Sequence, residues 1–520
     1  MTAAETFATG IHHVTLMTRR VQQNVDFYLG FLGLRLVKQT GGGEDSEQLH
    51  LFYGDRLGSP GSLVSFLVWE GGTQGRIGNG QVIEIAFAVP QGSLGEWMTR
   101  AIRAGVKFEG PLKEFGEPAL RLKDPDGIIV KLVASNLHAT APWQSDPAAV
   151  QRLRSVTILT ETPDETAAFV RRFGYRDGLR EGSVLRLLSD TDAIDVRDGS
   201  GFVSGAQGTG VADHVAFRAP DVAAVKRAEA EFSKLNSSPT NFHDRKYFIS
   251  LYVREPGGTL FELATDGPGF LVDETAERLG ETLFIPEGDR FREEELKIML
   301  PQFSRPGQPR IVHRELAFAH RLQTASHPDG HTMVLLHGTG GNETDLMPLA
   351  RRIAPNATLL GVRGRATDEG IARWFRRFDA TTFDQADIRK EAEAFAAFMA
   401  EAISSYGLDP SRLTFLGFSN GANFAAAVMG LFPETISRAI LLRPMQVLTT
   451  LPKADLTEKH VLTLTGTHDP FAFGAPPLEK WLRASGAEVE SKIVQAGHEL
   501  TQEDRKIAHE WFDETSDLAG

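Results

Sequence analysis

Residues 412–432 read RLTFLGFSNGANFAAAVMGLF, an apolar strand followed directly by an apolar helix. Between strand and helix stands Gly417-Phe418-Ser419-Asn420-Gly421, a G-x-S-x-G pentapeptide. The flanking glycines permit a tight, strained turn that exposes the serine oxygen, and the N-terminus of the following helix favours developing negative charge. A bare G-x-S-x-G is common, but its place between a strand and a helix predicts that Ser419 is a nucleophile.

Two later strands supply the partners of a nucleophilic serine, in the order acid and then histidine. The strand HVLTLTG (460–466) is followed by His468 and Asp469, and the strand VESKIVQAG (489–497) is followed by His498. We predict that His498 is the general base and that Asp469 fixes its tautomer. His468, next to Asp469, is the alternative base.

The chain from about residue 311 alternates strands with helices. The strands are HTMVLLHG, NATLLGV, SRLTFLGF, RAILLRP and HVLTLTG, and the longest helical stretch is IRKEAEAFAAFMAEAISSYG (388–407). Near-continuous apolar strands separated by helices predict a mostly parallel sheet covered on both faces. The loop in VLLHGTGGNE (334–343) follows a strand, and we predict that the backbone N–H groups of Thr339 and Asn420 form an oxyanion hole.

This part, about residues 311–515, resembles the carboxylesterase/phospholipase branch of the α/β-hydrolases, in particular the small hydrolases encoded near hydroquinone dioxygenases. The resemblance is carried by LLHGTGGNE, RWFRRFD (373–379), GFSNGAN, GTHDP and the Gly-His that contains His498. It implies an α/β-hydrolase fold and hydrolysis of small esters or thioesters. Residues 373–379 would line the acyl or leaving-group pocket, or form a solvated helix surface. A phospholipase or thioesterase activity stays open, because FAFGAPP follows GTHDP where many relatives have a polar, proline-led segment.

An internal repeat occupies the first 270 residues. KDPDGIIVKLVAS (123–135) aligns with REPGGTLFELATD (254–266), IEIAFAVP (83–90) with DHVAFRAP (213–220), and HHVTLMT (12–18) with RSVTILT (154–160). Each copy alternates strand, helix and three short strands, twice over, so we predict four βαβββ modules in an α+β fold. The predicted domains are 8–140 and 150–270 for the two copies, 271–310 for a tail helix and linker, and 311–518 for the C-terminal domain.

Three residues in the repeat suggest a metal site. Successive residues of a strand face opposite sides, and the pattern around His12 and His13 favours His13 as the one facing a cleft. His214 lies on the corresponding strand pattern of the second copy, and Glu262 is an acid among apolar strand neighbours, which is unfavourable unless it is paired or ligated. Two histidines and a carboxylate form the facial triad of non-haem Fe(II) oxygenases, so we predict a metal at His13, His214 and Glu262.

Residues 8–300 resemble the vicinal oxygen chelate (glyoxalase/bleomycin resistance/dioxygenase) superfamily, and within it the ring-cleaving dioxygenases that act on hydroquinones. The match is carried by GIHHVTL, YGDRLGSPG (53–61), DRKYFISLYVREPGGTLFELATDGPGF and LGETLFIP. It implies that the three ligands hold Fe(II), with Mn(II) as the alternative, and that His12, Arg245 and Tyr252 bind or protonate the substrate. Asp213 stands where relatives carry histidine, and its carboxylate could accept a hydrogen bond from a hydroquinone hydroxyl.

The repeat also defines a mirror position. If a pseudo-two-fold axis relates the copies, Ser155, Glu84 and Lys131 correspond to His13, His214 and Glu262. A lysine ammonium repels a divalent cation, so we predict one metal site built across the two copies and no metal at the mirror position.

Together these motifs predict a bifunctional enzyme. The N-terminal part would cleave a hydroquinone-like ring with O2 by extradiol-type chemistry, and the C-terminal part would hydrolyse a small ester. The alternatives for the N-terminal part are a metal-free binding (resistance) module and a glyoxalase-type isomerase, which needs four ligands.

Composition limits the partners. The net charge of −13 leaves no basic excess for nucleic acid, and the absence of cysteine excludes disulfides, thiolate metal sites and a cysteine nucleophile. The first residues lack a secretory-signal pattern, and no apolar run reaches the ~18 residues of a membrane helix. We therefore expect a cytoplasmic enzyme with small-molecule substrates and no membrane partner, for which homo-oligomerisation is open.

Overall fold

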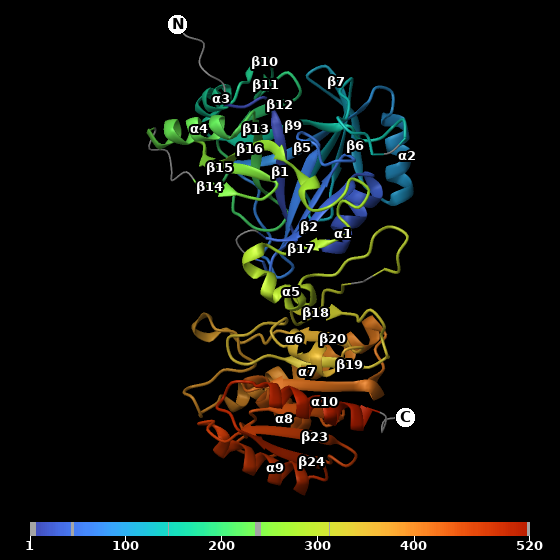
Figure 1. Cartoon of the computed structure of the whole chain (residues 1–520), viewed down its shortest axis with the longest axis vertical. Coiled ribbons are helices and arrows are strands. Elements are labelled where there is room, and N and C mark those ends of the chain that lie inside the picture. The colour runs from blue at the N-terminus through green and yellow to red at the C-terminus, as the bar shows by residue number, and fades with distance from the viewer. Residues whose placement is uncertain (1–6, 43–45, 144, 235–240, 311–312, 517–520) are drawn as a thin grey trace. The chain divides into compact units, whose positions relative to one another are not determined.

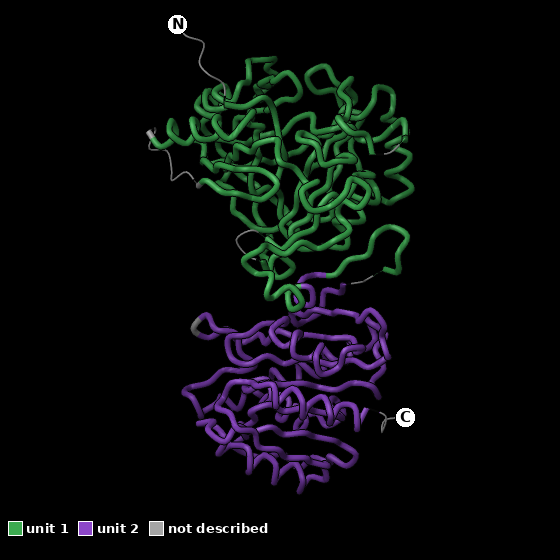
Figure 2. The backbone as a smooth tube through the Cα atoms, in the orientation of Figure 1, with its two compact units in different colours: residues 1–296, 302–311 green, residues 297–301, 312–520 purple. Residues whose placement is uncertain are grey.

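The computed structural model describes residues 7–42, 46–143, 145–234, 241–310 and 313–516. It divides into two compact units, one of residues 1–296 and 302–311 and the other of residues 297–301 and 312–520 (Figure 2). The first unit contains the internal repeat, and the second contains the strand–serine–helix stretch.

Four βαβββ modules make up most of the first unit, as predicted. The first is β1 (Ile11–Thr18), α1 (Val21–Val25, continued by a π-helix, Asp26–Phe31), β2 (Arg35–Gly41), β3 (Leu49–Gly54) and β4 (Leu63–Val68); the second is β5 (Gln81–Pro90), α2 (Leu94–Ala104), β6 (Phe108–Glu114), β7 (Glu117–Lys123) and β8 (Ile129–Ser135). The third is β9 (Arg152–Thr160), α3 (Pro163–Arg172), β10 (Arg176–Glu181), β11 (Val184–Leu188) and β12 (Ala193–Asp198); the fourth is β13 (Ala212–Ala219), α4 (Val222–Lys234), β14 (Asn241–Asp244), β15 (Phe248–Arg254) and β16 (Leu260–Pro268).

The modules pair across the two copies of the repeat. The first and fourth form one sheet, in the order β14-β15-β16-β13-β1-β4-β3-β2, and the second and third form another, in the order β10-β11-β12-β9-β5-β8-β7-β6 (Figure 1). In every module the first strand pairs in parallel with the last, and it pairs antiparallel with the first strand of the partner module. First strands therefore lie at the centre of each sheet, and all eight residues of β1 are buried.

A tail follows the fourth module. It contains a 3-10 turn (Phe270–Val272), β17 (Leu283–Phe284), a second 3-10 segment (Glu287–Arg292) and α5 (Glu293–Met299). β17 pairs in parallel with β2 and becomes the ninth strand of the first sheet.

The second unit is a seven-stranded sheet with helices on both faces. Its elements are β18 (His320–Gln323), β19 (Thr332–Leu336), α6 (Met347–Ile353), β20 (Thr358–Val362), a 3-10 turn (Asp368–Gly370), α7 (Gln385–Tyr406), a 3-10 turn (Pro410–Arg412), β21 (Leu413–Phe418), α8 (Asn420–Leu431), β22 (Arg438–Leu442), β23 (His460–Gly466), a 3-10 turn (Ala472–Gly474), α9 (Ala475–Ala484), β24 (Glu488–Val494) and α10 (Gln502–Ser516). The strand order is β18-β20-β19-β21-β22-β23-β24, parallel throughout except for β18.

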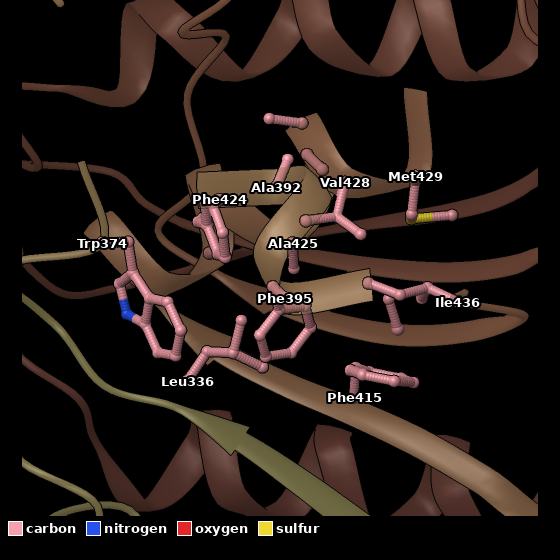
Figure 3. Close-up of a cluster of buried hydrophobic side chains, with 14 of the residues drawn as sticks. Leu336, Trp374, Ala392, Phe395, Phe415, Phe424, Ala425, Val428, Met429 and Ile436 are labelled. Carbon is pink, nitrogen blue, oxygen red and sulfur yellow. The ribbon is translucent and has the colours of Figure 1, made fainter. Parts of the chain in front are cut away.

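Neighbouring residues of each strand from β19 to β23 pack into different cores on opposite faces of the sheet, which explains the continuous apolar runs. Phe415 of β21 packs with residues of α7, α8 and α9 in the cluster of Figure 3, whereas the next residue, Leu416, packs with α6 and α10 on the opposite face. Figure 3 shows Phe395, Phe424 and Trp374 in the first of these cores. The predicted fold classes of both parts, paired βαβββ modules and a mostly parallel, doubly covered sheet, are confirmed.

Candidate functional site

The three predicted metal ligands meet on adjacent central strands. His13 lies on β1, His214 on β13 and Glu262 on β16, and all three are buried. Glu262 Oε2 is 3.1 Å from His13 Nε2 and 2.8 Å from His214 Nε2, and the two imidazole nitrogens are 3.3 Å apart. Among the described residues, this is the one cluster of His, Asp or Glu side chains with the spacing of a metal site.

The chemistry of this cluster fits a divalent cation. Both carboxylate oxygens of Glu262 are buried, and Oε2 faces the Nε2 atoms of His13 and His214. A buried carboxylate is unfavourable without a positive partner. Burial opposes ionisation, but the neighbouring His13 and His214 hold the pKa of Glu262 well below its ordinary value. Burial lowers the pKa of His13, which keeps its imidazole neutral and able to ligate. Two imidazoles and a carboxylate suit Fe(II) and also Mn(II).

Asp213 orients His214. The Asp213 carboxylate accepts a hydrogen bond from His214 Nδ1 over 2.7 Å, which directs Nε2 toward Glu262. Burial lowers the pKa of His214, but the charges of Glu262 and Asp213 outweigh burial and raise it to about 9 in the metal-free protein.

A β-bulge changes the position of His12. Strand alternation predicts that His12 and His13 face opposite sides, but the pairing of β1 with β13 shifts register between Ile11 and His13. His12 Nδ1 consequently lies 2.9 Å from His13 Nδ1, and both rings pack on Phe248. His12 is buried, and its burial and the adjacent His13 lower its pKa to about 3.

A cavity of about 1150 Å³ opens over the ligands. His13, Asp213, His214, Arg245 and Tyr252 line it, so it brings together five of the residues that the sequence singled out. The Arg245 guanidinium lies 5.4 Å from the centre of the Tyr252 ring. Burial and the Glu262 charge raise the pKa of the Tyr252 phenol well above its ordinary value, so this hydroxyl stays protonated and can donate a hydrogen bond.

Sequence reasoning missed two histidines of the cavity wall, His50 and His243. His50 Nε2 lies 3.0 Å from Ser65 Oγ, which lies 2.8 Å from Thr15 Oγ1. The available signal was the alternation in LHLFYG, which places His50 and Phe52 on one face of β3, and both line the cavity.

Ion pairs occupy the mirror position in the other sheet. Lys131 Nζ lies 3.0 Å from Glu84 Oε2 and 2.7 Å from Glu114 Oε2, and Arg121 Nη2 lies 2.6 Å from Glu84 Oε1. Ser155, the counterpart of His13, is buried on β9, where it pairs with Ala86 of the neighbouring strand β5. The ammonium group of Lys131 therefore takes the place that a cation would need.

Glu84→Gln should destabilise the protein in a pH-dependent way. Burial raises the pKa of Glu84, but Lys131 and Arg121 outweigh burial and hold this pKa below its ordinary value. The stabilising effect of the ionised Glu84 carboxylate is therefore present above about pH 4.5, and it is lost as the pH falls through the folded-state pKa of Glu84. We expect the free energy of unfolding at pH 7 to fall by about 3 kcal/mol, because Lys131 loses a buried partner. Urea unfolding between pH 4 and pH 7 measures this effect. The exposed Glu109→Gln is the control, and an equal loss at both pH values would contradict the prediction.

Backbone strain presents the serine in the second unit. Ser419 has φ 51° and ψ −115°, an unfavourable conformation for a residue with a side chain, and its N–H donates to the Leu442 carbonyl over 2.8 Å. A Cβ atom on Gly417 would lie 2.7 Å from the Ala422 backbone, and one on Gly421 would lie 2.0 Å from the Leu336 carbonyl oxygen. Only glycine fits at these two positions, which explains the G-x-S-x-G pattern.

Ser419, His498 and Asp469 lie in hydrogen-bonding order at the carboxyl edge of the sheet. His498 Nε2 is 2.9 Å from Ser419 Oγ, and His498 Nδ1 is 3.0 Å from Asp469 Oδ2. The rings of Phe418 and Phe471 flank the imidazole at 5.4 and 5.3 Å between centres. His468, the alternative base, is exposed, and its Nδ1 lies 3.0 Å from Thr467 Oγ1.

The predicted oxyanion residues lie at the ends of two neighbouring elements. Asn420 is the first residue of α8, and its side-chain oxygen accepts the N–H of Trp374 over 2.9 Å. Thr339 is exposed in the turn that follows β19. Trp374 Nε1 donates to the His337 carbonyl over 2.9 Å, which links residues 373–379 to this turn. The alternative of a solvated helix for that stretch is wrong, because it forms no helix and Arg373, Trp374 and Phe375 are buried.

Comparisons with known proteins divide the chain in the same way. Residues 10–132 match the Glyoxalase/Bleomycin resistance protein/Dioxygenase superfamily. MhqO of Bacillus subtilis, provisionally named a ring-cleaving dioxygenase, is 36% identical over 284 residues, which are 53% of this chain and 91% of MhqO. The chlorohydroquinone/hydroquinone 1,2-dioxygenase of Sphingobium indicum is 31% identical over 313 residues, 56% of this chain and 95% of that enzyme.

A third relative matches a shorter part of the chain. MhqD of Bacillus subtilis, provisionally named a hydrolase, is 36% identical over 186 residues, 35% of this chain and 93% of MhqD.

In the described part of the chain, no helix is long and apolar enough to cross a membrane.

Proposed function

We propose a function for this chain, which belongs to the ring-cleaving dioxygenases of the glyoxalase superfamily and carries an α/β-hydrolase in the same polypeptide. It cleaves a hydroquinone-like ring with O2 at His13, His214 and Glu262, and it hydrolyses a small ester at Ser419. The observation that carries the first activity is the buried Glu262 carboxylate, whose Oε2 lies 3.1 and 2.8 Å from the Nε2 atoms of His13 and His214, two residues that line the cavity. The relative from Sphingobium indicum supports a hydroquinone as the substrate class.

The residues around the cavity have distinct roles in this proposal. His13, His214 and Glu262 would hold Fe(II) or Mn(II), which supplies a template on which a deprotonated hydroquinone hydroxyl and O2 meet. Asp213 holds His214 in the ligating tautomer. Tyr252 donates a hydrogen bond to the substrate, and the positive charge of Arg245 beside its ring stabilises negative charge that develops on the substrate oxygens. His12 supports the orientation of His13 from behind.

The second activity follows from the order of hydrogen bonds at the serine. His498 Nε2 takes the proton of Ser419 Oγ as the serine attacks the ester carbonyl, and it then returns the proton to the leaving alcohol. Asp469 keeps the Nδ1 proton of His498 in place and stabilises the imidazolium. The backbone N–H groups of Asn420 and Thr339 donate to the oxyanion of the tetrahedral intermediate.

Removal of metal should separate the two activities. After dialysis against a chelator, the chain is expected to lose O2 consumption with hydroquinone and to keep hydrolysis of p-nitrophenyl acetate, because only the first site needs a cation. Anaerobic addition of Fe(II), or of Mn(II), to the dialysed protein should restore O2 uptake. An oxygen electrode and absorbance at the p-nitrophenolate band measure both activities on one sample. O2 uptake that survived complete removal of metal would contradict the proposal for the first site.

A further inference from the structure

A buried arginine, Arg443, contacts three parts of the serine site although it touches none of the three catalytic side chains. It directly follows β22, and its side chain has no exposed surface. Its φ of 54° lies in the left-handed region, which is uncommon for a residue with a side chain. The residue before it, Leu442, accepts the backbone N–H of Ser419. The strained position therefore lies one residue from the anchor of the nucleophile.

All five N–H donors of the Arg443 guanidinium have acceptors. Nε donates to the Gly497 carbonyl over 3.0 Å and Nη2 to the Glu499 carbonyl over 2.8 Å. Nη1 and Nη2 also bind the two carboxylate oxygens of Asp504 over 2.7 and 2.9 Å, and Nη1 reaches the Leu464 carbonyl over 3.4 Å. A guanidinium has five donors in a fixed plane, so this set of acceptors matches arginine and no other side chain.

Two of these acceptors flank the histidine. Gly497 and Glu499 are the residues on either side of His498, so Arg443 fixes the backbone on both sides of the imidazole. Asp504, in the first turn of α10, accepts in addition the N–H and the hydroxyl of Thr501 over 2.8 and 2.9 Å. The loop from β24 to α10 is thus held at three points around His498.

The same arginine reaches the strand that precedes the acid. Its backbone N–H donates to the Leu464 carbonyl of β23 over 2.7 Å, five residues before Asp469. Buried ion pairs add little stability compared with apolar side chains of equal volume, whereas their directional hydrogen bonds define a geometry. The contacts of Arg443 run to the anchor of Ser419, to the strand of Asp469 and to both neighbours of His498.

We propose that Arg443, paired with Asp504, is a positioning residue that holds His498 within hydrogen-bonding distance of Ser419. This inference rests on the proposed hydrolase function. In Arg443→Lys the positive charge remains, but three N–H donors in a different geometry replace five. The loop from β24 to α10, which contains His498, therefore loses hydrogen bonds that restrain it. Displacement of a catalytic group by about 1 Å lowers turnover by about 100-fold.

The test uses the full-length chain and counts active serines. A fluorophosphonate reagent titrates the fraction of molecules with a competent Ser419, and p-nitrophenyl acetate hydrolysis then gives kcat per titrated site and KM. For Arg443→Lys we expect full titration, kcat per site lower by about 10- to 100-fold, and KM within about twofold of the wild type. A merely structural role would lower the titrated fraction and leave kcat per site unchanged.

Arg438 supplies the matched control, because it is a buried arginine at the other end of β22. It donates to Thr515 Oγ1 over 2.8 Å, and its Nε and Nη1 have no acceptor. Arg438→Lys should keep kcat per titrated site at the wild-type value. If Arg443→Lys does not fold, Asp504→Asn keeps the shape of the pair and should also lower kcat per site, to a smaller extent.

The outcomes separate this inference from the proposed function. Hydrolysis that persists in Ser419→Ala would overturn the function proposed for the second unit, and this inference with it. An inactive Ser419→Ala together with an unchanged kcat per site in Arg443→Lys would overturn the role of Arg443 alone. Where only Asp504→Asn can be purified, an unchanged kcat per site in that variant has the same meaning.

Discussion

Ser419→Ala is expected to lower kcat for p-nitrophenyl acetate hydrolysis by about 10⁵- to 10⁶-fold, while O2 consumption with hydroquinone stays at the wild-type rate. Without the Oγ atom there is no nucleophile for His498 to activate, although the oxyanion donors and the binding surface remain. The variant should fold, because the Ser419 side chain makes no helix-cap hydrogen bond and alanine keeps the Cβ atom of the strained turn.

The choice of base is tested by a pair of histidine variants. His498→Ala is expected to lose activity to nearly the same extent as Ser419→Ala, since nucleophile and base act as one unit. His468→Ala is the matched control, because His468 is the exposed neighbour of Asp469 and lies against Thr467 instead of Ser419. Steady-state kinetics of the three variants at pH 8 measure this. A large loss of activity in His468→Ala with a small loss in His498→Ala would show that His468, and not His498, is the general base.

The serine site was predictable from sequence because its geometry is mostly local. The strand–turn–helix around Ser419 is contiguous, and the ends of parallel strands meet at one edge of a sheet, which brings Asp469 and His498 to the same place. By contrast, the contacts of Arg443 join four separate segments. No pattern within RAILLRP distinguishes this arginine from a surface residue, so only the structure reveals it.

The metal site was also predictable from sequence only in part. His13, His214 and Glu262 could be identified because they are polar residues in strands that are otherwise apolar, and the repeat indicated a site shared between the two copies. The pairing of first with fourth and second with third modules depends on contacts between distant strands, which a repeat alone does not specify. The contact of His12 with His13 depends on a register shift in β1, which strand alternation does not specify.

Glu262→Gln is expected to weaken metal binding by more than about 100-fold, since even residues that only support a ligand contribute 10- to 100-fold. Glutamine has the same shape, but it removes the one negative charge among the three ligands. Metal content after dialysis, measured by mass spectrometry, and O2 uptake with hydroquinone should both fall to background. Ester hydrolysis should be unchanged.

Thermal unfolding adds a readout that does not depend on catalysis. A ligand that binds only the folded state raises Tm, so added Mn(II) should raise the Tm of the wild type and leave that of Glu262→Gln unchanged. Glu114→Gln is the control, because Glu114 is the carboxylate that pairs with Lys131 at the mirror position and should not affect metal content. If Glu262→Gln kept one tightly bound metal per chain, the cation would have to lie elsewhere. A loss of metal in Glu114→Gln would instead indicate a site among the ion pairs around Lys131, where the positive charge of the ammonium argues against one.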